Sequence, residues 1–279
     1  METTLVTAPS YFPITLAEAK DYLRISHTNQ DTVIKNLIRT ATAKVEARTN
    51  RQLVLQTWDA FYDRFPSANE RFSLPRTDLE NYYLSYGAKS YIELPFGQLV
   101  SVTSVKYLDE NESETTFAAT NYTVDTDSII GKVVLKNNKS WPTTSLFDNN
   151  GVIIRFTSGW YAGDTWVADT PYAENAYIVP TTSSSQYEAG IVYKCTTSGT
   201  SGPSEPTWGL TIAGTTADNT AVWTAIGEGV PYELKAVIKI LVNDLYDTRE
   251  SEILTIGGSF IKAEEKLSSL INQYEIGFF

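Results

Sequence analysis

The sequence has few of the residues on which enzyme and metal sites usually depend. Its 279 residues include one cysteine, one histidine and one methionine. A single cysteine, Cys195, excludes an intrachain disulfide and a multi-cysteine zinc site, and we expect it to be a small buried hydrophobe. His27 falls in a predicted loop and lacks an obvious nucleophile partner, so a solvated side chain is expected there. The sequence therefore predicts no catalytic residue, no metal and no cofactor.

Positive charge and long apolar runs are also scarce. The chain has 22 Lys and Arg against 33 Asp and Glu, a net charge of −11. Such a balance argues against nonspecific wrapping of nucleic acid, which needs clustered basic residues, but it is compatible with an acidic wall past which DNA slides. No window approaches the roughly 20 apolar residues of a membrane helix, and the N-terminus lacks a basic signal-peptide region. We expect folding in a reducing cytoplasm and no membrane contact.

Helical patterns stand near both ends of the chain. The first predicted helix starts at Thr15, which forms a capping-box pattern with Glu18. A second predicted helix spans residues 31–49, with one continuous apolar face. A third runs between Pro231 and Arg249, and a final one follows Gly258. Residues 1–13 are predicted to be an irregular arm that packs on its own domain or on a neighbouring subunit.

Between residues 51 and 159 the hydrophobic period changes towards two. Short β-rich runs alternate with turn residues, and residues 109–114 are predicted to form an acidic hairpin tip. Residues 67–87 have no clear period and are predicted to be a long loop. The chain is thus predicted to be α+β, with a helical core and an antiparallel β lobe.

A third composition appears between residues 165 and 228. This stretch has one Lys, no Arg and seven Tyr or Trp, together with many Thr, Ser and Gly. It is typical of a small all-β module. If it is removed, Asp164 continues directly into Gly229, as expected for an insertion at a surface loop. We therefore predict a discontinuous main domain, residues 1–164 and 229–279, and an inserted aromatic-rich module, residues 165–228.

The aromatic residues of the insert allow two interpretations. Exposed rings can stack on sugar faces, and the candidates for such a site are Trp208, Trp166 and Tyr187. Trp208, in a loop rich in Gly, Pro and Ser, is predicted to be the most exposed ring, whereas Trp223 is predicted to lie in the core. The alternative is that the rings are simply the core of a small domain with little else to bury.

A series of short motifs runs through the chain in order. They are Pro13–Arg24 (PITLAEAKDYLR), Ala41–Leu53, Gln56–Trp58, Leu94–Pro95, Val100–Glu110, Tyr122–Asp125, Trp141–Pro142, Phe156–Trp160 and Val230–Arg249. In this order they resemble the head–tail connector (adaptor) proteins of long-tailed bacteriophages. Within the insert, residues from Trp166 to Trp223 are similar to chitin-binding-type carbohydrate-binding modules of phage tail and fibre proteins.

The connector resemblance implies a structural protein of the virion neck, made in the cytoplasm of the host bacterium. Such adaptors form a ring, usually a dodecamer, between the portal protein and a stopper or tail-completion protein. Double-stranded DNA passes through the ring without sequence-specific binding. The insert and the chain's own C-terminal sequence depart from the short members of the family.

The C-terminal segment is the candidate for portal docking. It is predicted to bind a portal groove as an amphipathic helix with an aromatic tip, so that truncation after Gly258 abolishes portal binding and leaves the fold intact. The candidate docking residues are Leu267, Leu270, Ile271, Tyr274, Phe278 and Phe279.

Two other functions are compatible with the sequence. One is a receptor- or glycan-binding protein associated with the tail or fibre, working through the insert. The other is a glycan-degrading enzyme, which needs two carboxylates across a cleft that the sequence does not identify.

Overall fold

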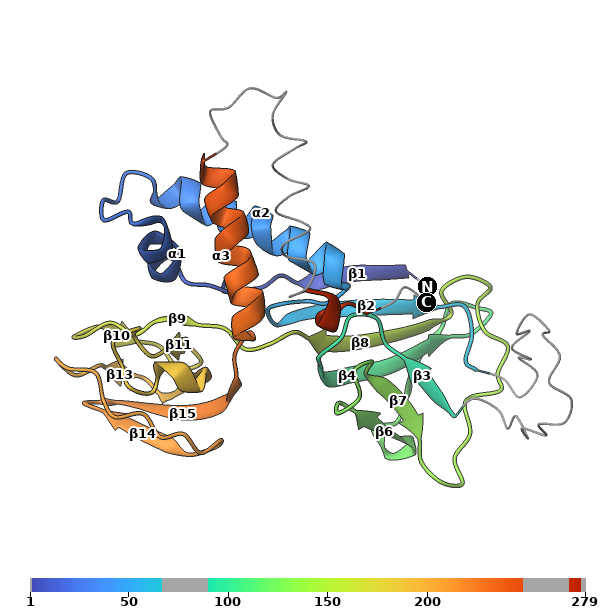
Figure 1. The fold of residues 1–279 in the computed structure, drawn as a ribbon. Helices are drawn as coiled ribbons and strands as arrows, with labels where there is room; N and C mark the ends of the chain where they lie inside the picture. Colours follow the sequence, from blue (N-terminus) through green and yellow to red (C-terminus); the bar gives the residue numbers. More distant parts are fainter. Residues whose placement is uncertain (1, 67–89, 248–270, 277–279) are drawn as a thin grey trace, which may run out of the picture. The chain divides into compact units, whose positions relative to one another are not determined.

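The computed structural model describes residues 2–66, 90–247 and 271–276 and has the α+β class predicted from the sequence (Figure 1). Its contacts divide the chain into two compact units. Residues 1–8 and 56–158 form the first, which we call the β lobe. Residues 9–55 and 159–279 form the second, which we call the helix–insert unit.

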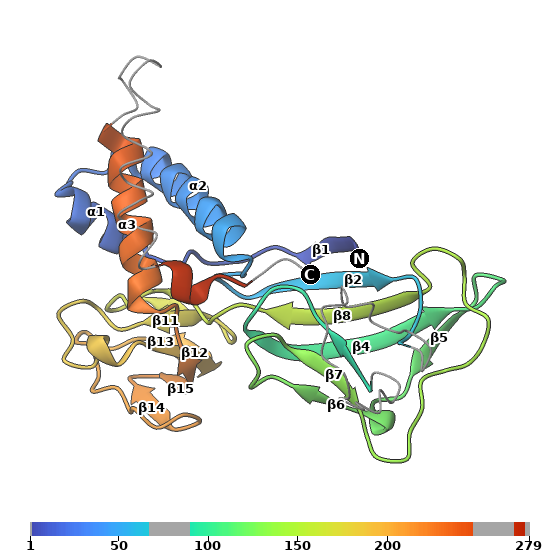
Figure 2. The ribbon, with the colours of Figure 1, turned by 45° about the vertical axis from the view of Figure 1, so that its right-hand side comes forward.

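The β lobe contains two sheets. The larger has five antiparallel strands in the order β1-β2-β8-β4-β5, and the smaller has three in the order β3-β7-β6 (Figure 2). The strands are β1 (Glu2–Thr7), β2 (Gln56–Tyr62), β3 (Tyr91–Glu93), β4 (Leu99–Leu108), β5 (Glu114–Phe117), β6 (Tyr122–Asp125), β7 (Lys132–Leu135) and β8 (Val152–Ser158), with the 3-10 turn η1 (Ala119–Asn121) before β6. Asp109 accepts hydrogen bonds from two backbone N–H groups in the β4–β5 turn, which is the predicted hairpin tip.

Alternation along the strands explains the core of the β lobe. Side chains from the central strands, such as Val105, Ile154 and Phe156, are fully buried on one face. On β8 the exposed Arg155 lies between two of these buried residues and pairs bidentately with Asp59 of β2, at 2.8 Å for both hydrogen bonds. One face of the larger sheet therefore packs in the core and the other carries charge, as the period of two predicts.

The N-terminal arm is a strand, so the prediction of an irregular segment is wrong for residues 2–7. β1 pairs antiparallel with β2, from Glu2 opposite Phe61 to Thr7 opposite Thr57. All but one of its side chains are exposed. Because backbone hydrogen bonds rather than burial hold this strand, its sequence carries no hydrophobic alternation to detect.

The helices of the helix–insert unit follow the predicted boundaries closely. They are α1 (Leu16–Leu23), α2 (Asp31–Thr49) and α3 (Tyr232–Asp247), with a 3-10 turn, η4 (Asn272–Tyr274), after the undescribed residues 248–270. The capping box at Thr15 and Glu18 is confirmed in both directions. The apolar faces of α2 and α3 pack together around Ile34, Ile38, Val237 and Ile238.

The insert forms a sheet of its own. Its strand order is β14-β15-β12-β11-β9, and a two-stranded ribbon joins β10 to β13. The elements are β9 (Asp164–Thr165), β10 (Pro171–Tyr172), β11 (Tyr177–Val179), η2 (Tyr187–Ala189), β12 (Ile191–Thr197), β13 (Gly199–Thr200), β14 (Thr215–Asp218) and β15 (Ala221–Glu228). Where this segment leaves and rejoins the rest of the unit, Tyr161 and Gly229 form a parallel β-bridge. The chain before the segment and the chain after it therefore meet at this bridge.

Gly159 permits a close backbone approach at the start of the second half of the helix–insert unit. Its φ is +111°, and a Cβ atom would lie 2.4 Å from the carbonyl oxygen of Val54. We expect Gly159→Ala to lower the free energy of unfolding by about 2 kcal/mol or more, through backbone strain and this clash. Urea unfolding measures this change in the free energy of unfolding. Gly209→Ala is the control, since its Cβ would meet its nearest neighbour at an ordinary 3.5 Å. Equal stabilities of the two variants would contradict the expectation.

Candidate functional site

The insert is attached to the helices through a buried carboxylate. Glu18, on α1, has a side chain only 3% exposed. One oxygen accepts the phenolic hydrogen bond of Tyr187 at 2.6 Å, and the other accepts the backbone N–H of Thr15 at 2.6 Å. Lys235 and Lys239 of α3 lie 3.7 and 3.6 Å from the same carboxylate. Glu18 therefore joins α1, α3 and the insert, and we call these five residues the Glu18 cluster.

Hydrogen bonds and charge together keep Glu18 ionised. Burial by itself raises the pKa of its carboxyl group, but Lys235, Tyr187, the N–H of Thr15 and Lys239 outweigh burial. The net effect places the pKa of Glu18 below its ordinary value. Burial and the neighbouring Glu18 carboxylate raise the pKa of Tyr187, so its hydroxyl stays a donor. The cluster is a charged but compensated contact.

The pKa shift of Glu18 predicts a dependence of stability on pH. Because its folded pKa is lowered, its contribution is complete above the unfolded value and is lost as the pH falls through the folded value. We expect the difference in unfolding free energy between the wild type and Glu18→Gln to narrow below about pH 4.5, the ordinary carboxyl value. Urea unfolding between pH 7 and pH 3 tests this, and a difference that grows on acidification would contradict it.

Further contacts fix the insert beside the helices. Tyr232, at the start of α3, donates a hydrogen bond to the carbonyl of Tyr187 at 2.7 Å. Tyr11 accepts the backbone N–H of Tyr177 at 3.0 Å, and the two rings meet edge to face at 5.8 Å. Tyr187 and Tyr177 lie on different elements of the insert, η2 and β11. The insert therefore contacts the helical part of the unit at more than one point.

The predicted sugar-stacking rings are not exposed. Trp208 is 2% exposed, so the prediction that it is the most exposed ring of the insert is wrong. Its indole N–H donates to Glu205 at 2.8 Å, and its ring packs 4.5 Å from that of Tyr193. Trp166 is 7% exposed, and Tyr187 lies half-buried in the Glu18 cluster. Trp208 and Trp166 therefore do not present a free face to a sugar, and the hydroxyl of Tyr187 is engaged with Glu18.

A second buried carboxylate organises the core of the insert. Asp218 is 2% exposed. One of its oxygens accepts the indole N–H groups of Trp166 and Trp223, at 2.8 and 3.1 Å, and the other accepts the backbone N–H of Gly202 at 2.7 Å. Trp223 is fully buried, which confirms its predicted place in the core, and Cys195 is buried as predicted.

The C-terminal candidates divide into two groups. Leu267, Leu270, Phe278 and Phe279 lie outside the described residues. Ile271 is 7% exposed and belongs to the helical core, and Tyr274 is partly buried against it. The backbone N–H of Ile276 donates to the carbonyl of Thr49 at 3.0 Å. This packing argues against the expectation that truncation after Gly258 leaves the fold intact, because truncation removes residues of the helical core.

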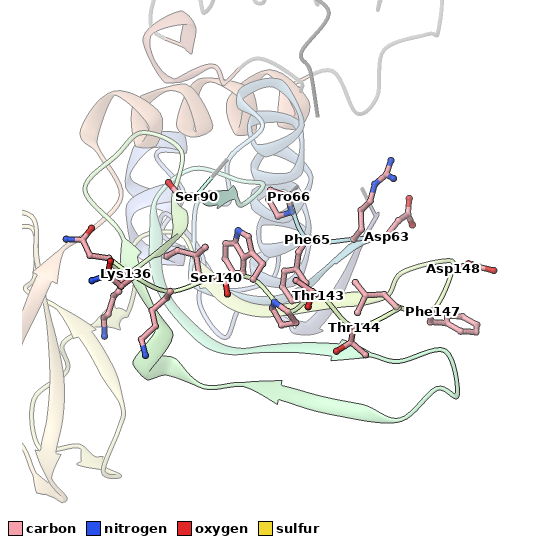
Figure 3. Close-up of a pocket in the computed structure, with 18 residues that line it drawn as sticks. Asp63, Phe65, Pro66, Ser90, Lys136, Ser140, Thr143, Thr144, Phe147 and Asp148 are labelled. Atoms are coloured by element: carbon pink, nitrogen blue, oxygen red, sulfur yellow. The ribbon is translucent and has the colours of Figure 1, made fainter. Parts of the chain in front are cut away.

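A groove of about 1020 Å³ lies in the β lobe (Figure 3). Phe65 and Trp141 stack within it at 5.2 Å, and Lys136 and Asp148 are among its polar lining residues. Asp63 also lines it and accepts the backbone N–H of Asn150 at 3.1 Å, so this carboxylate holds the turn before β8.

No helix in the described part of the chain is long and apolar enough to cross a membrane.

A family model matches part of the chain. Residues 13–116 match the family model described as Phage gp6-like head-tail connector protein. This segment begins before α1 and ends in β5. The connector resemblance seen in the sequence is thus confirmed for these residues. A search of curated proteins finds no match.

Solved structures share the fold over the whole chain. Chains from "Neck of empty GTA particle computed with C6 symmetry" and "Virion of native gene transfer agent (GTA) particle" align with a TM-score of 0.56. A chain from "Neck of native GTA particle computed with C12 symmetry" aligns with a TM-score of 0.54. Each is 14% identical, and each alignment covers 100% of this chain and 97% of the other. At this identity, the likeness concerns the fold.

Only part of this arrangement is visible in the sequence. The capping box reveals Glu18, but it gives no sign of the ion pairs that Glu18 forms with α3. The signal for them is Lys235, which interrupts the apolar face of α3 and stands four residues before Lys239. A buried lysine in such a position needs an anionic partner. Nothing in the local sequence indicates that Tyr187 faces a carboxylate, and the sequence predicts it as a sugar-stacking ring instead.

Proposed function

We propose that this protein is a structural adaptor of a tailed bacteriophage or related particle, forming a ring between head and tail. The observation that carries the proposal is the connector family match over residues 13–116. The fold shared with chains of gene transfer agent necks supports it. As such a component, the protein works by assembly rather than by catalysis. It completes the head and surrounds a channel through which double-stranded DNA passes.

The proposed partners are further copies of the chain, the portal protein and a stopper or tail-completion protein. A ring forms when each subunit repeats one heterologous contact until the rotation closes. The likeness to necks with C6 and C12 symmetry supports a ring, and we propose a dodecamer. The net charge of −11 favours passage of DNA over binding to it.

We further propose that the main domain comprises residues 1–164 and 229–279 and that residues 165–228 are an insertion. The bridge between Tyr161 and Gly229 supports this division, because an insertion into a loop requires the flanking chain to meet on both sides of it. The Glu18 cluster makes the insert a fixed projection of the adaptor. Receptor or glycan binding through Trp208 and Trp166 has less support, since both rings are buried.

Disruption of the gene tests the proposed function. Electron microscopy of particles from the disrupted phage is expected to show full or leaking heads beside separate, finished tails. Intact tailed particles that fail only to adsorb would overturn the adaptor in favour of a receptor-binding protein. Deletion of residues 165–228 distinguishes the two further, since loss of adsorption alone would assign the working role to the insert.

The C-terminal segment is proposed to dock on the portal. Because Ile271 and Tyr274 pack on the helices, they anchor the segment. The proposed docking residues are then Leu267, Leu270, Phe278 and Phe279.

We expect Phe278→Ser with Phe279→Ser to weaken portal binding at least tenfold without changing the unfolding midpoint. Ile271→Ala is the contrasting variant and is expected to lower the free energy of unfolding by about 2 kcal/mol or more. Co-sedimentation with purified portal and urea unfolding measure both effects. Normal portal binding by the double variant would contradict the docking role.

A further inference from the structure

The larger sheet of the β lobe has two open edges. β1 and β5 are its outermost strands, as Figure 2 shows, and among the described residues neither pairs with a strand on its outer side. Open edges present unpaired backbone N–H and C=O groups to any strand that can approach. Both edges belong to the same sheet. One copy of the chain could therefore pair through β1 with one neighbouring copy and through β5 with another.

Proline and lysine, two residues that commonly block pairing at a sheet edge, are missing from both strands. β1 has the sequence ETTLVT and β5 has ETTF, without proline or lysine in either strand. The one irregularity of β1 lies between Leu5 and Thr7, which leaves Glu2–Leu5 in regular register with β2. β5 is regular over all four of its residues. The two edges therefore offer regular segments of equal length.

Exposure indicates that these strands are accessible. Leu5 and Val6 of β1 are 42% and 41% exposed, which is high for apolar side chains. Glu114, Thr115 and Thr116 of β5 are exposed, and only Phe117 is buried. An accessible edge with β-branched and apolar side chains is the kind of surface to which another strand adds.

Strand direction determines what kind of assembly the edges allow. All four pairings across the sheet, from β1 through β2, β8 and β4 to β5, are antiparallel. β1 and β5 therefore run in the same direction. Placing β5 of one copy beside β1 of the next continues the sheet with a parallel pair, and the contact is heterologous, so its repetition generates a ring or a helix.

We propose that neighbouring subunits associate by pairing β5 of one copy with β1 of the next, in a parallel register that extends the sheet from subunit to subunit. The inference rests on the proposed ring and specifies the surface that forms it. Backbone hydrogen bonds carry the contact, which requires little apolar area and keeps each subunit folded on its own before assembly.

Disulfide trapping in assembled particles tests the pairing. Double variants combine Thr3→Cys or Thr4→Cys on β1 with Thr115→Cys or Thr116→Cys on β5, and the buried Cys195 is kept. After mild oxidation of purified particles, a non-reducing gel is expected to show a ladder of multimers for at least one double variant. Each single variant is expected to remain monomeric. Far-UV circular dichroism of the purified variants checks that these substitutions leave the fold unchanged.

A matched pair and the single variants distinguish the other outcomes. Thr4→Cys with Ser145→Cys, an exposed loop position of the same lobe, is expected to give no ladder. Dimers from Thr4→Cys alone would show β1 pairing with β1 and would overturn the proposal, as would monomers from every double variant present in particles. If the wild-type chain is absent from purified particles, the proposed function itself fails.

Discussion

Replacing Glu18 by glutamine is expected to lower the free energy of unfolding of the helix–insert unit by about 3 kcal/mol. The substitution keeps the shape of the side chain but removes its charge, and it leaves the ammonium group of Lys235, whose side chain is 11% exposed, without a counter-ion. Removing one partner of a buried ion pair lowers the free energy of unfolding by more than the intact pair adds to it, because the remaining charge stays desolvated. Glutamine also presents an NH₂ group to one of the two donors that Glu18 accepts, the hydroxyl of Tyr187 or the N–H of Thr15.

Urea unfolding followed by tryptophan fluorescence measures this effect, and hydrogen exchange locates it. Exchange near Tyr187 is expected to accelerate, since the variant loosens the attachment of the insert to α1. Glu188→Gln is the matched control, because Glu188 is the next residue along the chain and is exposed. If the two variants have the same stability, the Glu18 cluster does not hold the insert.

Replacing Asp218 by asparagine is expected to lower the free energy of unfolding by about 2 to 4 kcal/mol. Three N–H groups converge on this carboxylate, two from indole rings and one from Gly202. Asparagine supplies one acceptor oxygen and one donor NH₂ group in the same space. At least one buried donor, from Trp166, Trp223 or Gly202, then loses its acceptor and faces another donor.

The fluorescence of Trp166 and Trp223 reports directly on the unfolding of the Asp218→Asn variant, because both indole rings contact the substituted side chain. Asp169→Asn is the control, since Asp169 is exposed and its φ of 48° suits asparagine equally well. We expect this control to stay within about 0.5 kcal/mol of the wild type. A wild-type unfolding midpoint for Asp218→Asn would show that the carboxylate is not needed to build the core of the insert.

Patterns with a strong local cause are predictable from this sequence. The bounds of α2 follow from a single uninterrupted apolar face, and the start of α1 follows from the capping box of Thr15 and Glu18. The strands of the β lobe follow from alternation and turn residues. In each case, the residues that form the element also carry its signal, so no knowledge of tertiary contacts is needed.

Features that depend on distant partners are not predictable in this way. β1 is a strand because β2 lies beside it, and its own side chains contribute almost nothing to a core. Trp208 lies in a loop whose composition indicates exposure, yet Glu205 and Tyr193 bury it. The insert has few aliphatic residues, so its aromatic rings become its core. This is the alternative interpretation that the sequence left open.

The arrangement of the insert bears on its use in an assembled particle. A module held at Tyr187 and Tyr177 moves with the helices that it contacts, so its orientation on a ring is defined by the ring. Decoration or reinforcement of the neck needs such a fixed projection. A receptor-binding module needs a free binding surface, and Trp208 and Trp166, two of the three predicted sugar-stacking rings, are buried.

Cryo-electron microscopy of the neck of wild-type particles tests the central claim most directly. The account predicts a closed ring of this chain between the capsid and the tail, with its sheets continuous from subunit to subunit and one inserted module projecting from each copy. Density for the chain at the tail tip or fibres, or its absence from the joint between head and tail, would contradict the account.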